Sequence, residues 1–229
     1  MGPLDVLQEI VGLHPEIACL STRQVQPGGL FQARASSELA EPLIERALEI
    51  RNVTGLPFMD AINMSIAQDQ RADADIVRQI AFHNFVDRPF WHSVDSDLAR
   101  SISEQMSGPA MCVISSVLRL RDGSIRHLSM IDFHIVHSSA VLAIVELICR
   151  ELGGSGWILD SGRSYHYYGT RILTSDELSR FLGKALLFAP LTDRAWIAHQ
   201  LIDGACSLRL AEHASKIGRP VVVADFSGR

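Results

Sequence analysis

Cysteine is scarce in this sequence, and the four that occur show no spacing that would hold a metal ion. Cys19, Cys112, Cys149 and Cys206 lie far apart, which excludes a zinc-finger pattern and indicates four free thiols in a reducing compartment. Long apolar runs are also missing, since no segment approaches the ~18 residues of a membrane span. The first residues lack a basic region followed by an apolar one, the mark of a signal peptide. These absences predict a cytoplasmic protein with no membrane partner.

An excess of positive charge is missing as well. The net charge of the 229 residues is −5, whereas proteins that bind duplexes tightly carry a strong basic patch. The charge is unevenly distributed, because residues 1–110 contain 8 Lys and Arg against 15 Asp and Glu, and residues 111–229 contain 13 against 11. The second half is therefore compatible with a phosphate-bearing ligand, and the acidic first half indicates a solvated helical surface.

The hydrophobic pattern divides the chain into two parts. Residues 1–106 are predicted to be a mainly helical N-terminal region, because apolar residues there recur at helical spacing and Ser36 or Ser37 can cap the clearest helix. The pattern then changes to strands alternating with helices, which predicts an α+β core with a mostly antiparallel sheet over residues 107–229. The predicted helices of the first part are 4–11, 36–50, 58–67, 74–82 and 96–106; the core is predicted as strands 111–120, 125–136, 156–160, 165–172 and 220–225 with helices 139–152, 174–188 and 191–201.

The strand predicted over residues 125–136 carries two polar side chains two residues apart, Asp132 and His134. Side chains alternate along a strand, so both would lie on the same face. A carboxylate beside an imidazole can hold a divalent metal ion. The alternative is structural: Asp132 forms a local ion pair and His134 is a hydrogen-bonded core histidine.

A second polar group is the run Ser161-Gly-Arg-Ser-Tyr-His166. Gly162 permits an unusual backbone turn, and Arg163 can approach a phosphate. Ser164 and His166 are again two residues apart and can donate hydrogen bonds to phosphate oxygens. An ordinary hairpin turn with surface serine and arginine is the alternative.

A third group contains Asp203, Arg209 and Lys216. Asp203 follows two apolar residues, which predicts an isolated acid in an apolar setting. Arg209 lies between two leucines, which predicts an inward-facing arginine that needs an anionic partner. The alternative is a structural ion pair between Asp203 and Arg209.

The order of these three groups resembles the archaeo-eukaryotic primase superfamily, which includes the bacterial primase-polymerases. The resemblance covers roughly residues 107–220, and its most specific part is the run from Ser161 to His166. It implies an antiparallel sheet of the RNA-recognition-motif type. The site residues that it implies are Asp132 and Asp203 as metal ligands, Ser164 and His166 as phosphate binders, and Arg209 and Lys216 as triphosphate clamps.

The resemblance also implies an activity: transfer of nucleotides from nucleoside triphosphates to a 3′-hydroxyl on a DNA or RNA template during DNA replication, with a helicase as a possible partner. The family's first motif carries two acids, and here the second acid is replaced by His134. As a third metal ligand, this imidazole would favour Mn²⁺ over Mg²⁺. The competing hypothesis is a catalytically inactive module on the same fold that binds nucleotide or nucleic acid.

Overall fold

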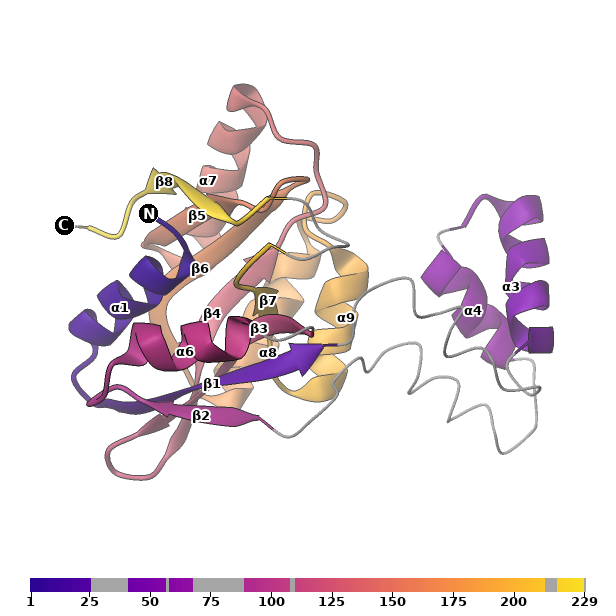
Figure 1. Ribbon diagram of the computed structural model, residues 1–229. Helices are drawn as coiled ribbons and strands as arrows, with labels where there is room; N and C mark the ends of the chain where they lie inside the picture. The colour runs from indigo at the N-terminus through magenta and orange to yellow at the C-terminus, as the bar shows by residue number, and fades with distance from the viewer. Residues whose placement is uncertain (26–40, 57, 68–88, 108–109, 213–217, 229) are drawn as a thin grey trace. The chain divides into compact units, whose positions relative to one another are not determined.

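The computed structural model describes residues 1–25, 41–56, 58–67, 89–107, 110–212 and 218–228 (Figure 1). Contacts within the chain divide it into two compact units, which are described separately. The larger unit contains Met1–Val25 and Asp87–Arg229, and the smaller unit is the insertion Gln26–Val86. The predicted boundary between residues 106 and 107 does not coincide with this division, because the first 25 residues belong with the core.

The larger unit is built on one eight-stranded sheet in the order β2-β1-β3-β4-β6-β5-β8, with β7 also paired to β3. Every pairing is antiparallel. An α+β fold with an antiparallel sheet is thereby confirmed, while the RNA-recognition-motif type stays a prediction. The strands are β1 (Ile17–Val25), β2 (Phe90–Ser93), β3 (Met111–Leu120), β4 (Ile125–Asp132), β5 (Gly156–Asp160), β6 (Tyr165–Leu173), β7 (Ser207–Arg209) and β8 (Val221–Asp225).

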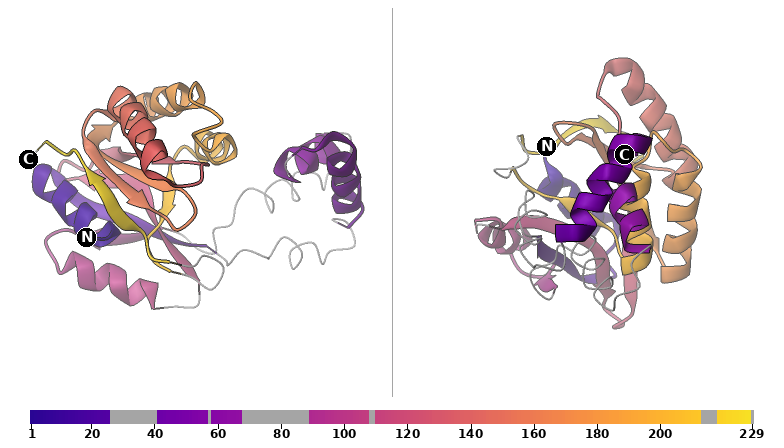
Figure 2. Two further views of the ribbon diagram at one scale, coloured as in Figure 1. Left: turned by 90° about the horizontal axis from the view of Figure 1, so that it is seen from above. Right: turned by 90° about the vertical axis from the view of Figure 1, so that its right-hand side faces the viewer.

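Helices cover both faces of this sheet, so the larger unit has three layers. Helices α1 (Pro3–Leu13) and α6 (Leu98–Met106) lie on one face; α7 (Ser139–Gly153), α8 (Ser175–Leu186) and α9 (Arg194–Asp203) lie on the other (Figure 2, left). Their apolar sides meet the sheet in one core, in which Trp157, Tyr167 and Tyr168 are fully buried. Within the described residues, no helix is long and apolar enough to cross a membrane.

Local sequence signals fix where the helices of the core begin. The Ser138 side chain accepts a hydrogen bond from Val141 N at the start of α7, and Thr174 forms a capping box with Glu177 at the start of α8. Helix α9 begins three residues later than predicted, after its cap Asp193. The reason is tertiary, because the preceding Thr192 forms a β-bridge with Phe133.

The smaller unit contains two described helices, α3 (Glu41–Thr54) and α4 (Phe58–Ala67). They pack through a small buried cluster: Leu43, Ala47, Ala61, Ile62 and Ile66. Helix 58–67 matches its prediction, whereas Ser36, Ser37 and the helix predicted over 74–82 lie outside the described residues. The prediction of a mainly helical region over residues 1–106 is not confirmed, because β1 and β2 belong to the sheet.

The sheet branches at Ser116, in the middle of β3. Strand β7 pairs with residues 113–115 and β4 pairs with residues 117–119. Ser116 N donates to the Cys206 carbonyl (2.7 Å), and Ser116 Oγ accepts from Cys206 N (2.8 Å) and contacts His127 Nδ1 (3.2 Å). These bonds anchor the short strand that carries Arg209, while β4 continues toward β6.

Candidate functional site

The first two polar groups meet where β4 ends beside β6. Asp132 and His166 are directly opposite each other in the register of these two strands, so their side chains share one face of the sheet. Asp132 Oδ1 lies 3.6 Å from His166 Nε2, with 27% of the Asp132 side chain and 7% of the His166 side chain exposed. The expected convergence of these two residues is therefore present.

Arg209 brings a buried positive charge to the same site. Only 7% of the residue is exposed, and its guanidinium donates to the carbonyls of Ala211 (2.6 Å), Gly218 (2.8 Å) and Ser161 (2.6 Å). Burial lowers the pKa of Arg209, and the neighbouring Tyr168 and Asp132 act in the opposite direction. Within the described part of the chain, Arg209 is held by carbonyls and makes no ion pair with Asp203.

Tyr168 was not predicted as a site residue, although it lies two residues after His166 on β6 and therefore on the same face of the strand. Its side chain is fully buried, and its hydroxyl has no hydrogen-bond partner among the described residues. Burial raises the pKa of this hydroxyl, Arg209 lowers it and Asp132 raises it further. The site therefore contains a neutral buried donor close to opposite charges.

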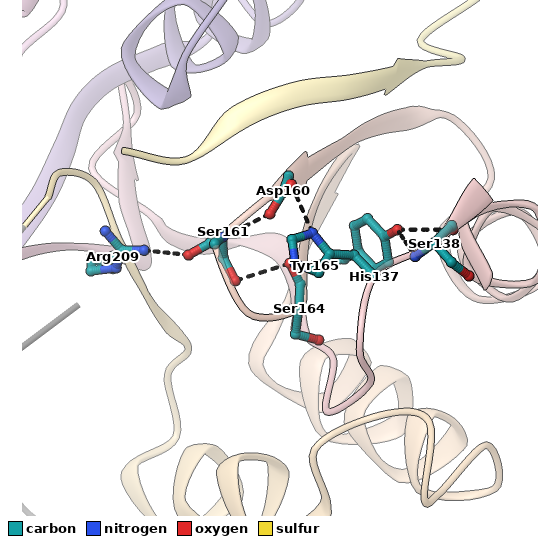
Figure 3. Close-up of polar contacts among 8 residues, drawn as sticks. His137, Ser138, Asp160, Ser161, Ser164, Tyr165 and Arg209 are labelled. Carbon is teal, nitrogen blue, oxygen red and sulfur yellow. Dashed lines mark hydrogen bonds and ion pairs between the residues drawn. The ribbon is translucent and has the colours of Figure 1, made fainter. Parts of the chain in front are cut away.

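Residues Ser161 to Ser164 form the predicted turn between β5 and β6, and Tyr165 and His166 begin β6 (Figure 3). Gly162 has φ +92°, a conformation that side chains disfavour, and its N–H donates to Asp160 Oδ1 (2.7 Å). Ser161 N donates to the Ser164 carbonyl (2.9 Å). The turn exposes Arg163 to solvent and points the Ser161 carbonyl at Arg209 (Figure 3).

Ser164 joins the end of β4 to this turn. Its hydroxyl oxygen accepts a hydrogen bond from Ile135 N (3.0 Å), which leaves the O–H itself as a donor. The predicted role of Ser164 in phosphate binding stays a prediction, as does that of Arg163.

A second set of contacts ties the turn to the start of α7 (Figure 3). His137 Nδ1 lies 2.9 Å from Asp160 Oδ2, and the Tyr165 hydroxyl donates to the Ser138 carbonyl (3.2 Å) while accepting from Ser138 N (3.1 Å). The two rings, His137 and Tyr165, meet edge to face. These contacts fix the position of the turn from the side opposite Arg209.

His134 does not stand beside Asp132 on a strand, because β4 ends at Asp132 and not at Val136 as predicted. The His134 side chain is 79% exposed, and its Nδ1 lies 3.6 Å from Asp193 Oδ2. The core-histidine alternative is therefore wrong. Asp193 was not predicted as a site residue, because the sequence indicates only that an aspartate at this position can cap a helix.

The third polar group is only partly brought into the site. Asp203 is the last residue of α9, where Leu201 and Ile202 are 39% and 64% exposed, so its predicted apolar setting is wrong. Lys216 lies outside the described residues. Among the residues that the structure describes, no group of three His, Cys, Asp or Glu side chains could hold a metal ion. The predicted roles of Asp132, His134 and Asp203 as metal ligands stay predictions.

Comparison with protein families identifies a family to which most of the larger unit is similar. The family model described as AEP-like, archaeo-eukaryotic primase 1D-like, matches residues 92–219, a range that includes Asp132, His166 and Arg209. No curated protein and no solved structure matches the chain significantly.

Proposed function

The chain belongs to the AEP-like family, archaeo-eukaryotic primase 1D-like, and we propose that it transfers nucleotides from nucleoside triphosphates to a 3′-hydroxyl on a DNA or RNA template. Membership supports a primase-polymerase-like nucleotidyltransferase at the level of the family. A role in DNA replication, with a helicase or another replication protein as partner, is part of the same proposal.

The observation that carries the proposal is the pairing of Asp132 with His166, close enough to the buried Arg209 for Asp132 to influence the pKa of its guanidinium. Asp132 Oδ1 faces His166 Nε2 at 3.6 Å and interacts electrostatically with Arg209. A triphosphate needs cationic and N–H donors, which His166 and Arg209 supply. Because three carbonyls already hold the guanidinium, little side-chain freedom is lost when its remaining N–H groups bind phosphate. Arg163, Ser164 and Lys216 are proposed as further phosphate contacts.

Asp132 fits a divalent cation, Mn²⁺ or Mg²⁺, that arrives on the phosphates of the nucleotide. Mg²⁺ sites of this type use one or two carboxylates together with substrate phosphates. When bound, the cation would neutralise the charge that develops on the attacked phosphate and the leaving pyrophosphate. His134 and Asp203 stay proposed as additional ligands, and Asp132 is the ligand on which the proposal rests.

A primer-extension assay with template, labelled nucleotides and either Mg²⁺ or Mn²⁺ tests the activity directly. Asp132→Asn keeps the size of the side chain and removes its charge, so we expect transfer to fall by on the order of 100-fold or more. Asp176→Asn is the matched control, since Asp176 is an exposed acid in the first turn of α8, and it should leave transfer unchanged. Equal product from Asp132→Asn and wild type would overturn the proposal.

A catalytically inactive nucleotide-binding module is the second candidate. It is favoured by the histidine at position 134, which lies beside Asp193, and by the lack of a three-residue metal set among the described residues. This function predicts nucleotide binding that survives chelation by EDTA and no transfer with Mg²⁺ or Mn²⁺. Binding that disappears with EDTA would favour the enzyme.

A further inference from the structure

The connection between α8 and α9 runs directly beside the end of β4. Phe133 and Thr192 form an antiparallel β-bridge. On one side of it, Asp193 N donates to the Asp132 carbonyl (3.0 Å), and on the other, His134 N donates to the Leu191 carbonyl (2.9 Å). This short ladder makes Asp193 the cross-strand neighbour of Asp132, although 60 residues separate them in the sequence.

Cross-strand neighbours direct their side chains to the same side of a sheet, so the two carboxylates belong to one site. Asp193 Oδ1 accepts a hydrogen bond from Trp196 N (2.9 Å) and caps α9. Its other oxygen, Oδ2, turns toward His134 Nδ1 at 3.6 Å, and 25% of the side chain is exposed. Carboxylates that share one side of a sheet in this way can bind the same divalent cation.

An independent observation points to a ligand at this place. The Tyr168 hydroxyl is fully buried and has no hydrogen-bond partner within the described part of the chain, yet it lies near enough to Asp132 and Arg209 for both to influence its pKa. Buried hydroxyls are normally hydrogen-bonded, and an exception is a sign of a missing water, ion or ligand. A phosphate oxygen between Arg209 and the cation would accept this hydrogen bond.

We propose that Asp132 and Asp193 together hold the divalent cation of a bound nucleoside triphosphate, with Asp193 supplying the second acid that position 134 lacks. The inference rests on the proposed function because it takes the ligand to be a nucleoside triphosphate, but it does not require that the protein transfers nucleotides. Two carboxylates and the phosphate oxygens complete such a site, so no third protein ligand is needed. In this chain the second acid lies on the segment between α8 and α9 that pairs with the end of β4, and not on β4 itself.

Asp193→Asn tests the proposal, because asparagine caps a helix as well as aspartate does and removes the charge. Mn²⁺ affinity is measured by calorimetry and by electron paramagnetic resonance in the presence of a non-hydrolysable nucleoside triphosphate. We expect Asp193→Asn and Asp132→Asn each to weaken Mn²⁺ binding at least tenfold. The control is Asp97→Asn, since Asp97 caps α6 in the same way by accepting from Arg100 N (3.0 Å), and its Mn²⁺ affinity should equal that of wild type.

Asp193→Ser provides a second variant that retains the cap and lacks the carboxylate, and thermal melting confirms that both variants fold. The role of Asp193 would be overturned if the folded Asp193 variants bind Mn²⁺ as tightly as wild type does while Asp132→Asn loses Mn²⁺ binding. If the Asp193 variants lose Mn²⁺ while wild type transfers no nucleotide, the cation site stands and only the proposed transfer activity fails.

Discussion

His92 and His166 are both buried in the sheet, but their partners differ in kind. His92 is 3% exposed; its Nε2 lies 2.7 Å from Thr22 Oγ1 and its Nδ1 lies 2.7 Å from Ser101 Oγ. Thr22 Oγ1 donates to Gln105 Oε1 (2.9 Å). A consistent chain of hydrogen bonds therefore runs from the Ser101 hydroxyl through His92 and Thr22 to Gln105, and both ring nitrogens of His92 have a partner. His92 thus belongs to a closed network of neutral groups.

His166 is 6% exposed and faces the Asp132 carboxylate at 3.6 Å, beyond the length of a good hydrogen bond. That carboxylate also influences the pKa of Arg209 and of the Tyr168 hydroxyl. Charged groups that keep donor or acceptor capacity can bind a charged ligand, whereas a closed neutral network has no capacity left for one. The comparison teaches that burial of a histidine alone says little about function. The charge and distance of its partners separate a structural position from a binding position.

The largest effect is expected on stability, from His92→Ala. This change removes a buried ring, leaves a cavity and deprives the Thr22 and Ser101 hydroxyls of partners, so we expect a loss of about 3 kcal/mol in the free energy of unfolding. Urea denaturation of the purified protein measures it. Nucleotide affinity of the folded variant should be unchanged; an affinity that falls with stability would show that the two regions are not separate.

His166→Ala should give the reverse result. Loss of a donor to phosphate is expected to weaken nucleotide binding about tenfold or more, with a smaller loss of stability than His92→Ala causes. His127→Ala is the matched control, since His127 is 3% exposed and the hydrogen-bond partners of its ring among the described residues are the hydroxyls of Ser116 and Ser175. If His127→Ala weakens nucleotide binding as much as His166→Ala does, the comparison fails.

The dependence of stability on pH should come from the neutral networks. Burial lowers the pKa of His92 and of His127, so the unfolded chain binds protons more readily than the folded protein. The free energy of unfolding is therefore expected to fall as the pH drops below about 6.5, by at most ~1.4 kcal/mol per pH unit for each histidine. Urea titrations between pH 7.5 and 5 measure this slope, and His92→Gln should reduce it. A wild-type protein that gains stability on acidification over this range would contradict the assignment.

The smallest effect concerns the turn that supports Arg209. At Gly162, φ is +92°, so Gly162→Ala should cost roughly 1–2 kcal/mol and shift the Ser161 carbonyl that Arg209 binds. Gly183 is exposed in α8 with open space around it, and Gly183→Ala should stabilise the protein by about 0.5–1 kcal/mol. Thermal melts of the two variants are compared, and a shift of the same sign in both would show that the turn imposes no strain.

Much of the local structure was predictable from the sequence because its causes lie within a few residues. Ser138, Thr174 and Glu177 cap helices through bonds three positions along the chain, and Gly162 forms its turn with an adjacent aspartate. The period of two along a strand likewise predicted that Asp132 and His166 each belong to a polar face. The order of these motifs was enough to indicate the family.

The tertiary structure alone decided which distant residues meet. The pairing of Thr192 with Phe133 places Asp193 beside Asp132, and His134, which lies beyond the end of β4, is 79% exposed. Similarly, β1 and β2 join the sheet across a 61-residue insertion, Gln26–Val86, and Arg209 binds carbonyls of three separate residues. Which remote segments become neighbours depends on how their apolar faces pack against a common core, and the local spacing of residues does not specify that choice.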